Sequence, residues 1–307
     1  MMMAQKKVLF IIGAGHCGSS LLALILGSHS HCFSAGELSN LPNRYRKGLY
    51  IDCVNCNSEF WDSTFGESGL KQLSIGLGDT RATPYIPLKL EKAVREFLGQ
   101  DRIFRPYSVL LSNVRKDVLI DASKYYLWVD RKTQTKEFTS GAVRPYLLHL
   151  MRDGRAVVNS YLRKYPDKDI SEFTQEWMEK TKQRQAFYNT FDRGEKIQVA
   201  YEALASDPQT IVTEICQFLG IEFAPDMLNY WKYPHHDISG NDGTYSLVRR
   251  YNQQQALAKI EQTHGDYYKK MDLGIRLDLR WKTELSPEKL EAFNRVAGKF
   301  NQAYAWE

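Results

Sequence analysis

The sequence predicts an α/β fold in which helices flank a central parallel sheet. Two observations support this class. Short apolar runs that fit buried strands alternate along the chain with segments of helical periodicity. Polar and glycine-containing segments follow several of these strands, as they do at the carboxyl edge of open α/β sheets. Because no internal repeat, low-complexity tract or linker interrupts the pattern, we expect one domain over residues 1–307.

The first elements are a strand, a glycine-rich turn and a helix. The apolar run Val8–Ile12 predicts a buried strand, and Leu21–Leu26 predicts the helix that follows it. A short second strand is expected at Cys32–Ala35. Residues 43–81 are rich in Gly, Ser, Asn, Asp and aromatics and have poor periodicity. We interpret them as a partly helical surface insertion that could cover a substrate.

The later elements continue the alternation. Further strands are expected at Val118–Asp121, Pro145–Leu150 and Lys196–Tyr201. Helices are expected at Glu91–Leu98, Ala156–Lys164, Ser171–Tyr188 and Ile211–Gly220, with a closing helix that starts at Ser286 and runs to Phe300. The polar residues 235–274 are expected to form loops.

The composition is that of an ordinary globular protein. Hydrophobic residues make up 43% and charged residues 25% of the chain. The net charge of +5 suits an anionic ligand, but no block of like charges indicates a nucleic-acid partner. Strand-like sequence begins at Lys7, no apolar run is long enough to cross a bilayer, and the five cysteines are an odd number. We therefore expect no signal peptide, no membrane partner and a cytoplasmic location.

The turn after the first strand has the composition of a phosphate-binding loop. Gly13 and Gly18 fit the first half of G-x-x-x-x-G-K-[ST], but Ser19 occupies the position of the lysine. Free N–H groups and the dipole at a helix N-terminus favour an anion. That lysine normally reaches the β- and γ-phosphates of a nucleoside triphosphate, so we expect a phosphorylated ligand other than ATP or GTP. The alternative is a glycine-rich turn without function.

A second anion site is indicated at the end of another strand. Arg152 follows a buried strand, and Ser160 lies eight residues later in the next helix. A guanidinium fork and a hydroxyl can hold one phosphate. Alone, these two residues would also fit a solvated helix face. Together with the glycine loop they suggest a nucleotide that carries phosphate groups at both ends.

These motifs resemble the sulfotransferases that use 3′-phosphoadenosine 5′-phosphosulfate (PAPS) as donor, and bacterial small-molecule members in particular. The resemblance rests on the loop G-x-G-x-x-G-S-S-L-L, on Arg152–Ser160, and on Tyr201-Glu202-Ala203-Leu204 followed by Pro208 and Phe218-Leu219-Gly220. The stretches His236–Asn241 and Leu277–Trp281 are similar to bacterial members as well. The family implies a P-loop-like fold and the product adenosine 3′,5′-bisphosphate (PAP).

The resemblance assigns donor-binding roles residue by residue. Arg152 and Ser160 match the pair that holds the 3′-phosphate, and Tyr201 matches a residue close to the adenine. Arg249 or Arg250, in the loop-rich segment expected near the donor site, could also face the 3′-phosphate. The 5′-phosphosulfate loop is matched by Gly15, His16, Cys17, Gly18, Ser19 and Ser20.

The resemblance also suggests the residues of the transfer step. His16 departs from the Lys or Arg usual at its position, and a neutral His16 would leave Lys124 as the cation at the leaving group. Glu37 is the expected general base, because Ala35-Gly36-Glu37 resembles the family's Gly-Glu and follows a strand. It could also be an exposed surface glutamate. His235 or His236 is the alternative base. In Asp121-Ala122-Ser123-Lys124, Ser123 or Lys124 could contact the sulfuryl group.

The predicted function is transfer of a sulfuryl group from PAPS to a hydroxyl or amine of a small molecule, such as a natural product. Cys53 and Cys56 have the spacing of half a zinc site, but no second half follows, so no metal is expected. Tyr45, Tyr50, Phe60 and Trp61 could line the acceptor pocket or pack the core of the insertion. The alternatives are a small-molecule kinase with a degenerate loop and a non-catalytic nucleotide-binding module.

Overall fold

A five-stranded sheet forms the centre of the computed structural model, which describes residues 5–48, 59–252 and 273–307. The strands lie in the order β2-β3-β1-β4-β5, and every pair is parallel. This confirms the predicted class of fold. The strands are β1 (Lys7–Gly13), β2 (Cys32–Ser34), β3 (Val118–Lys124), β4 (Arg144–Met151) and β5 (Glu195–Ala200).

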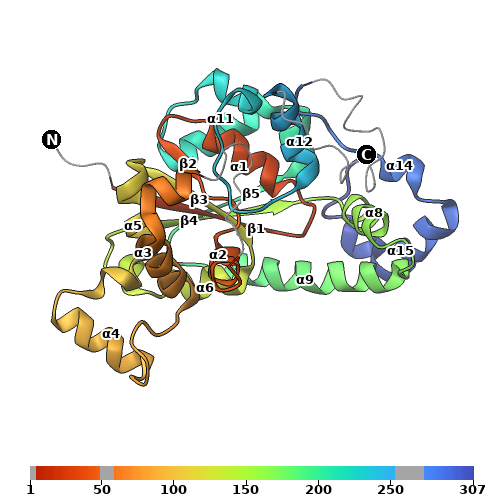
Figure 1. Cartoon of the computed structure of the whole chain (residues 1–307). Coiled ribbons are helices and arrows are strands. Elements are labelled where there is room, and N and C mark those ends of the chain that lie inside the picture. The colour runs from red at the N-terminus through yellow and green to blue at the C-terminus, as the bar shows by residue number, and fades with distance from the viewer. Residues whose placement is uncertain (1–4, 49–58, 253–272) are drawn as a thin grey trace.

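Helices cover both faces of this sheet, and Figure 1 shows their arrangement. The N-terminal half contains α1 (Ser19–Gly27), α2 (Leu41–Arg46), α3 (Glu59–Gly78), α4 (Leu88–Phe97), α5 (Pro106–Val114), α6 (Tyr126–Thr133) and α7 (Lys136–Thr139). The C-terminal half contains α8 (Gly154–Lys164), α9 (Ile170–Thr190), α10 (Tyr201–Ser206), α11 (Pro208–Leu219), α12 (Asp242–Tyr251), α14 (Trp281–Glu284) and α15 (Pro287–Asn301). Short 3-10 helices are η1 (Leu38–Asn40), η2 (Asp101–Phe104) and η3 (Pro225–Lys232).

The alternation of side chains along β1 divides the core into two layers. Leu9 and Ile11 pack with α1, α11 and α12 on one face of the sheet. Val8, Phe10 and Ile12 pack on the other face with residues of α3, α5, α6 and α7. All five side chains are fully buried, which explains why the strand reads as a continuous apolar run.

A third apolar cluster fixes helix α8 beside the sheet. Trp177 of α9 packs on Phe293 and Phe300 of α15. A Cβ at Gly154, the first residue of α8, would lie 2.5 Å from the Trp177 ring, so only glycine allows this close approach. The helix that follows Arg152 is therefore held by packing that lies outside the sheet.

The structure differs from the predicted elements in the C-terminal third. The segment expected as loops contains the helix α12. Its N-cap residue is Asn241, and the Asn241 side chain accepts a hydrogen bond from the Thr244 N–H. Tyr201 begins α10 instead of ending a strand. The closing helix α15 has the predicted start, with Ser286 as N-cap and Pro287 in the first turn. None of the helices within the described ranges is long and apolar enough to cross a membrane.

Candidate active site

The glycine loop connects β1 to α1 and presents the N-terminus of that helix. Gly18 is the N-cap residue with φ 93°, and no side chain caps the helix. A Cβ at Gly18 would lie 2.4 Å from the Tyr201 ring, and a Cβ at Gly15 would lie 2.2 Å from the Tyr161 hydroxyl oxygen. Glycine at these two positions therefore lets the aromatic rings pack against the loop backbone beside the N-terminus of α1, where an anion would bind. Ser19 and Ser20 add two hydroxyl groups at the same helix end.

His16 also has a left-handed backbone, with φ 63°. Its ring packs edge-on against Tyr161, with the ring centroids 4.8 Å apart. Its carbonyl oxygen accepts a hydrogen bond of 2.6 Å from Nη1 of Arg152. The glycine loop and the end of β4 are therefore in direct contact.

Arg152 lies one residue beyond β4 and is only 8% exposed. Its guanidinium stacks on Tyr201 at 4.2 Å from the ring centroid, and its Nη2 lies 3.2 Å from Oδ2 of Asp278. Burial opposes its charge, but the neighbouring Tyr201 and Asp278 outweigh this effect and raise the pKa of Arg152 above its ordinary value. A permanent cation thus lies at the carboxyl edge of the sheet.

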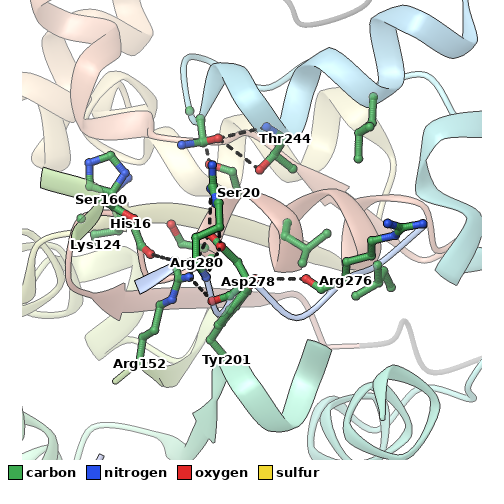
Figure 2. A pocket seen from close by; sticks show the side chains of 18 of the residues that line it. His16, Ser20, Lys124, Arg152, Ser160, Tyr201, Thr244, Arg276, Asp278 and Arg280 are labelled. Atoms are coloured by element: carbon green, nitrogen blue, oxygen red, sulfur yellow. Dashed lines mark hydrogen bonds and ion pairs between the residues drawn. The ribbon is translucent and has the colours of Figure 1, made fainter. Parts of the chain in front are cut away.

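A segment near the C-terminus, residues 274–280, closes one side of the site. The Arg276 carbonyl accepts a hydrogen bond of 3.2 Å from the Tyr201 hydroxyl. Both carboxylate oxygens of Asp278 accept hydrogen bonds of 2.8 Å from Arg280. Burial opposes the charge of Asp278, but these bonds and the nearby Arg152 hold the pKa of Asp278 well below its ordinary value. Figure 2 shows Asp278 between the two arginines.

Glu37 and Lys124 form an ion pair on the opposite side of the site. Glu37 follows Gly36, which has φ 65° and could not carry a Cβ because Ile238 N would lie 2.9 Å away. The Glu37 N–H donates to the Ile238 carbonyl, which anchors its backbone. Lys124 is the last residue of β3 and has a left-handed φ of 69°. A carboxylate and an ammonium thus meet beside the glycine loop.

One pocket of about 320 Å³ unites these groups, which is large enough for a small-molecule ligand. Figure 2 labels ten of its residues, which come from the glycine loop, α1, β3, the end of β4, α8, α10, α12 and the 274–280 segment. Of the residues predicted from the sequence, those that line the pocket are Gly15, His16, Gly18, Ser19, Ser20, Glu37, Lys124, Arg152, Ser160 and Tyr201. Segments more than a hundred residues apart in the chain thus meet at one edge of the sheet.

Three predicted donor-binding residues do not line the pocket. The Cys17 side chain is fully buried and points toward Gly13, where a Cβ would lie 2.6 Å from its Sγ. Burial also raises the pKa of the Cys17 thiol. Arg249 and Arg250 lie on the last turn of α12, outside the pocket lining. These two arginines were expected in a loop near the donor site. They lie instead on the last turn of a helix, and this turn does not line the pocket.

The alternative bases and the Ser123 hydroxyl also lie elsewhere. His235 is buried with its Nε2 2.7 Å from the Tyr230 carbonyl, and His236 stacks on Phe60 with ring centroids 3.9 Å apart. Burial lowers the pKa of both histidines to about 4. The Ser123 hydroxyl donates to the buried Asp121, away from the pocket.

The described aromatic residues of the insertion pack into the core layer on one face of the sheet. Trp61 is fully buried, and Phe60 stacks on Phe33 at 5.4 Å between ring centroids. Tyr45 packs against the same cluster. Tyr45, Phe60 and Trp61 therefore do not line the pocket, and they pack against the sheet instead of forming a separate core of the insertion. Tyr50, Cys53 and Cys56 lie outside the described residues.

Sequence reasoning missed several pocket residues. On α8 these are Tyr161, Arg163 and Lys164, which directly follow Ser160. The Nη2 of Arg163 donates to the Ser160 hydroxyl at 3.0 Å. In the 274–280 segment they include Arg276, Asp278 and Arg280. The stretch Leu277–Trp281 was recognised in the sequence, but nothing in it indicated that it lies beside the ends of β4 and β5.

The fold and the site together define a class: an α/β protein with a cationic pocket at the carboxyl edge of a parallel sheet. Residues 145–225 match the sequence model of the Sulfotransferase family. Two similar solved structures cover nearly the whole chain. They are the "Sulfotransferase Domain from the Synechococcus PCC 7002 Olefin Synthase" (20% identity, 98% of this chain and 96% of that chain, TM-score 0.50) and the "Sulfotransferase Domain from the Curacin Biosynthetic Pathway" (19%, 98% and 99%, TM-score 0.51).

The family match over residues 145–225 confirms the resemblance to sulfotransferases seen in the sequence, and the two solved domains share the fold of this chain. A curated relative, an uncharacterized protein of Aquifex aeolicus (strain VF5), is 23% identical over 239 residues. That match covers 74% of this chain but only 27% of the relative. The chain therefore spans about a quarter of the length of that protein.

Proposed function

We propose that the chain transfers a sulfuryl group from PAPS to a hydroxyl or amine of a small-molecule acceptor. The observation that carries this proposal is the contact between two anion sites from different strands. Arg152, at the end of β4, donates to the carbonyl of His16 in the loop after β1. One pocket can thus receive a nucleotide with charged groups on both its 5′ and 3′ sides.

The residues fit the donor in charge and in shape. The 5′-phosphosulfate would lie at the N-terminus of α1, with Ser19 and Ser20 as additional donors. The 3′-phosphate would lie against Arg152 and Ser160, and Arg163 adds a second guanidinium there. Tyr201 would pack near the adenine.

The transfer needs a base beside the attacking atom of the acceptor and positive charge beside the oxygen that leaves. We assign Glu37 as the base that takes the proton from the acceptor as its oxygen or nitrogen attacks sulfur. The bond between sulfur and the bridging oxygen breaks in line, and the electron pair leaves with PAP. Lys124, His16 and the loop N–H groups would stabilise the charge on that oxygen. The Glu37–Lys124 pair supports this assignment, since it holds base and cation beside the loop.

The acceptor class is supported by the origin of the two solved domains, which come from an olefin synthase and from the curacin biosynthetic pathway. We propose a natural-product acceptor on this basis. A cytoplasmic setting without a membrane or nucleic-acid partner belongs to the same proposal.

A ligand-binding comparison followed by a turnover assay tests the function. PAP should raise the melting temperature, whereas ATP with magnesium should not, because the loop lacks the lysine that reaches the β- and γ-phosphates. Stabilisation by ATP alone would contradict the donor assignment. Transfer of label from ³⁵S-PAPS to a panel of hydroxylated and amine metabolites then distinguishes an enzyme from a binding module.

A further inference from the structure

Helix α4 has its polar side turned inward and its apolar side turned to solvent. Figure 1 shows this helix at the edge of the molecule, standing out from the body. A surface helix normally buries its apolar stripe against the core. The reversed orientation therefore indicates that the apolar side of α4 binds another molecule.

Hydrogen bonds and an ion pair with residues 79–83 anchor the polar side of α4 and fix the orientation of the helix. The buried Glu91 carboxylate accepts hydrogen bonds of 3.0 Å from the N–H groups of Ala82 and Thr83. It also accepts one of 2.9 Å from Nε of Arg95. Lys92 forms an ion pair of 3.3 Å with Asp79. The bonds to Ala82, Thr83 and Asp79 would be lost if the helix rotated to bury its apolar stripe.

The apolar side forms a continuous stripe at helical spacing. Leu90, Val94 and Phe97 follow the i, i+4, i+7 pattern and are 55%, 47% and 90% exposed. Tyr85 and Leu98 extend the stripe at its two ends, at 95% and 56%. Scattered exposed apolar residues are ordinary, but a contiguous stripe of this kind marks an interaction surface.

The charges beside the stripe fit a second copy of the same helix. Lys89, Ala93 and Glu96 lie along one edge of the stripe, with the small Ala93 in the middle. In an antiparallel pair of identical helices, the same edge of each helix faces its counterpart. Lys89 of one copy then faces Glu96 of the other, twice by symmetry. Lys89 has no ion pair with any described residue, and Glu96 uses only Oε1 for its partner Lys136.

We propose that α4 is a homodimer interface in which two copies pair antiparallel through the stripe Leu90, Val94 and Phe97. The two exposed aromatic side chains, Tyr85 and Phe97, each offer on the order of 150–250 Å². With the aliphatic residues of the stripe, two copies would bury on the order of 1,200 Å², at the lower end of stable interfaces. A pairing of this size predicts a dimer that dissociates on dilution.

Sedimentation velocity over a concentration series tests the dimer. The wild-type protein should sediment as a dimer at high concentration, and Phe97→Glu should be monomeric with an unchanged melting temperature. Lys289→Glu, on the exposed side of α15, serves as the matched charge control and should leave the dimer intact.

A mixing experiment tests the charge pairing itself. Lys89→Glu places like charges against Glu96 of the second copy, and Glu96→Lys places like charges against Lys89. Each variant alone should dimerise at least tenfold more weakly than the wild-type protein. An equimolar mixture should recover the dimer, because all facing charges are then opposite.

A wild-type protein that stays monomeric at every concentration would overturn the proposal, and so would a dimer that Phe97→Glu leaves intact. Failure of the mixture to dimerise would overturn the antiparallel pairing. Sedimentation of the monomer with phosphatidylcholine–phosphatidylserine vesicles, lost in Phe97→Glu, would instead identify the stripe as a membrane-binding surface.

Discussion

Replacing Arg152 by alanine tests whether one side chain holds the 3′-phosphate. The substitution removes the hydrogen bond to the His16 carbonyl and the ion pair with Asp278, which keeps its two bonds to Arg280. The expected cost to folding is about 1–3 kcal/mol. Two lost charge-assisted bonds to the phosphate would cost about 3–6 kcal/mol, which is on the order of a 10²–10⁴-fold weaker PAP affinity.

Calorimetric titration with PAP and with ADP, which lacks the 3′-phosphate, measures this effect. Arg152→Ala should lose affinity for PAP and retain its affinity for ADP. Arg155→Ala is the matched control, because Arg155 also pairs with an aspartate, Asp153, and stacks on an aromatic ring, Trp281, but does not line the pocket. If Arg152→Ala binds PAP with an affinity within threefold of the wild-type protein, Arg152 does not hold the 3′-phosphate. The same conclusion follows if the variant loses as much affinity for ADP as for PAP.

Three further predictions follow from the site and the core. Glu37→Gln should lower turnover by about 10²–10⁴-fold with PAP affinity retained, and full activity in a sulfate-transfer assay would exclude Glu37 as the base. Gly15→Ala should weaken PAP binding because its Cβ would lie 2.2 Å from the Tyr161 hydroxyl oxygen. Adding Tyr161→Phe removes that oxygen and should restore part of the lost affinity in the same titration. If the double variant binds PAP no better than Gly15→Ala, this contact is not the cause of the loss. Burial raises the pKa of Asp237 to about 7, so the folded protein holds a proton there that the unfolded chain releases above about pH 4. The free energy of unfolding should therefore fall as pH rises through this window, by at most about 4 kcal/mol. Urea denaturation at pH 5 and pH 8 measures this fall, which Asp237→Asn should remove. If the free energy of unfolding changes equally between the two pH values in both proteins, Asp237 is not the group responsible.

The strands were the most predictable part of the fold. A parallel strand covered on both faces must be apolar throughout, so β1, β3 and β4 are visible as short apolar runs. Helix α12 was not predicted, because it begins after a polar stretch and its apolar residues, Tyr245, Leu247 and Val248, are few. Its cap residue Asn241 is the one local signal that could have located it.

Within the site, the residues next to strand ends were predictable and those brought by tertiary contacts were not. Glu37 and Arg152 follow strands and Lys124 ends one, and parallel strands end at one edge. Asp278 lies far from any strand in the sequence, and its contact with Arg152 is a tertiary feature that the sequence does not announce. Cys17 was expected to line the loop, but its side chain is buried against Gly13, a contact that the sequence does not indicate.

The bond between Arg152 and the His16 carbonyl has a consequence for ligand selection. It links the loop after β1 to the end of β4, so under the proposed function the pocket would respond to the spacing of two charged groups. A ligand with both groups at that spacing would gain a chelate effect, because the first contact places the second at high effective concentration. The guanidinium would therefore favour a nucleotide with phosphates at both ends over the abundant nucleotides that carry all their phosphates at one end.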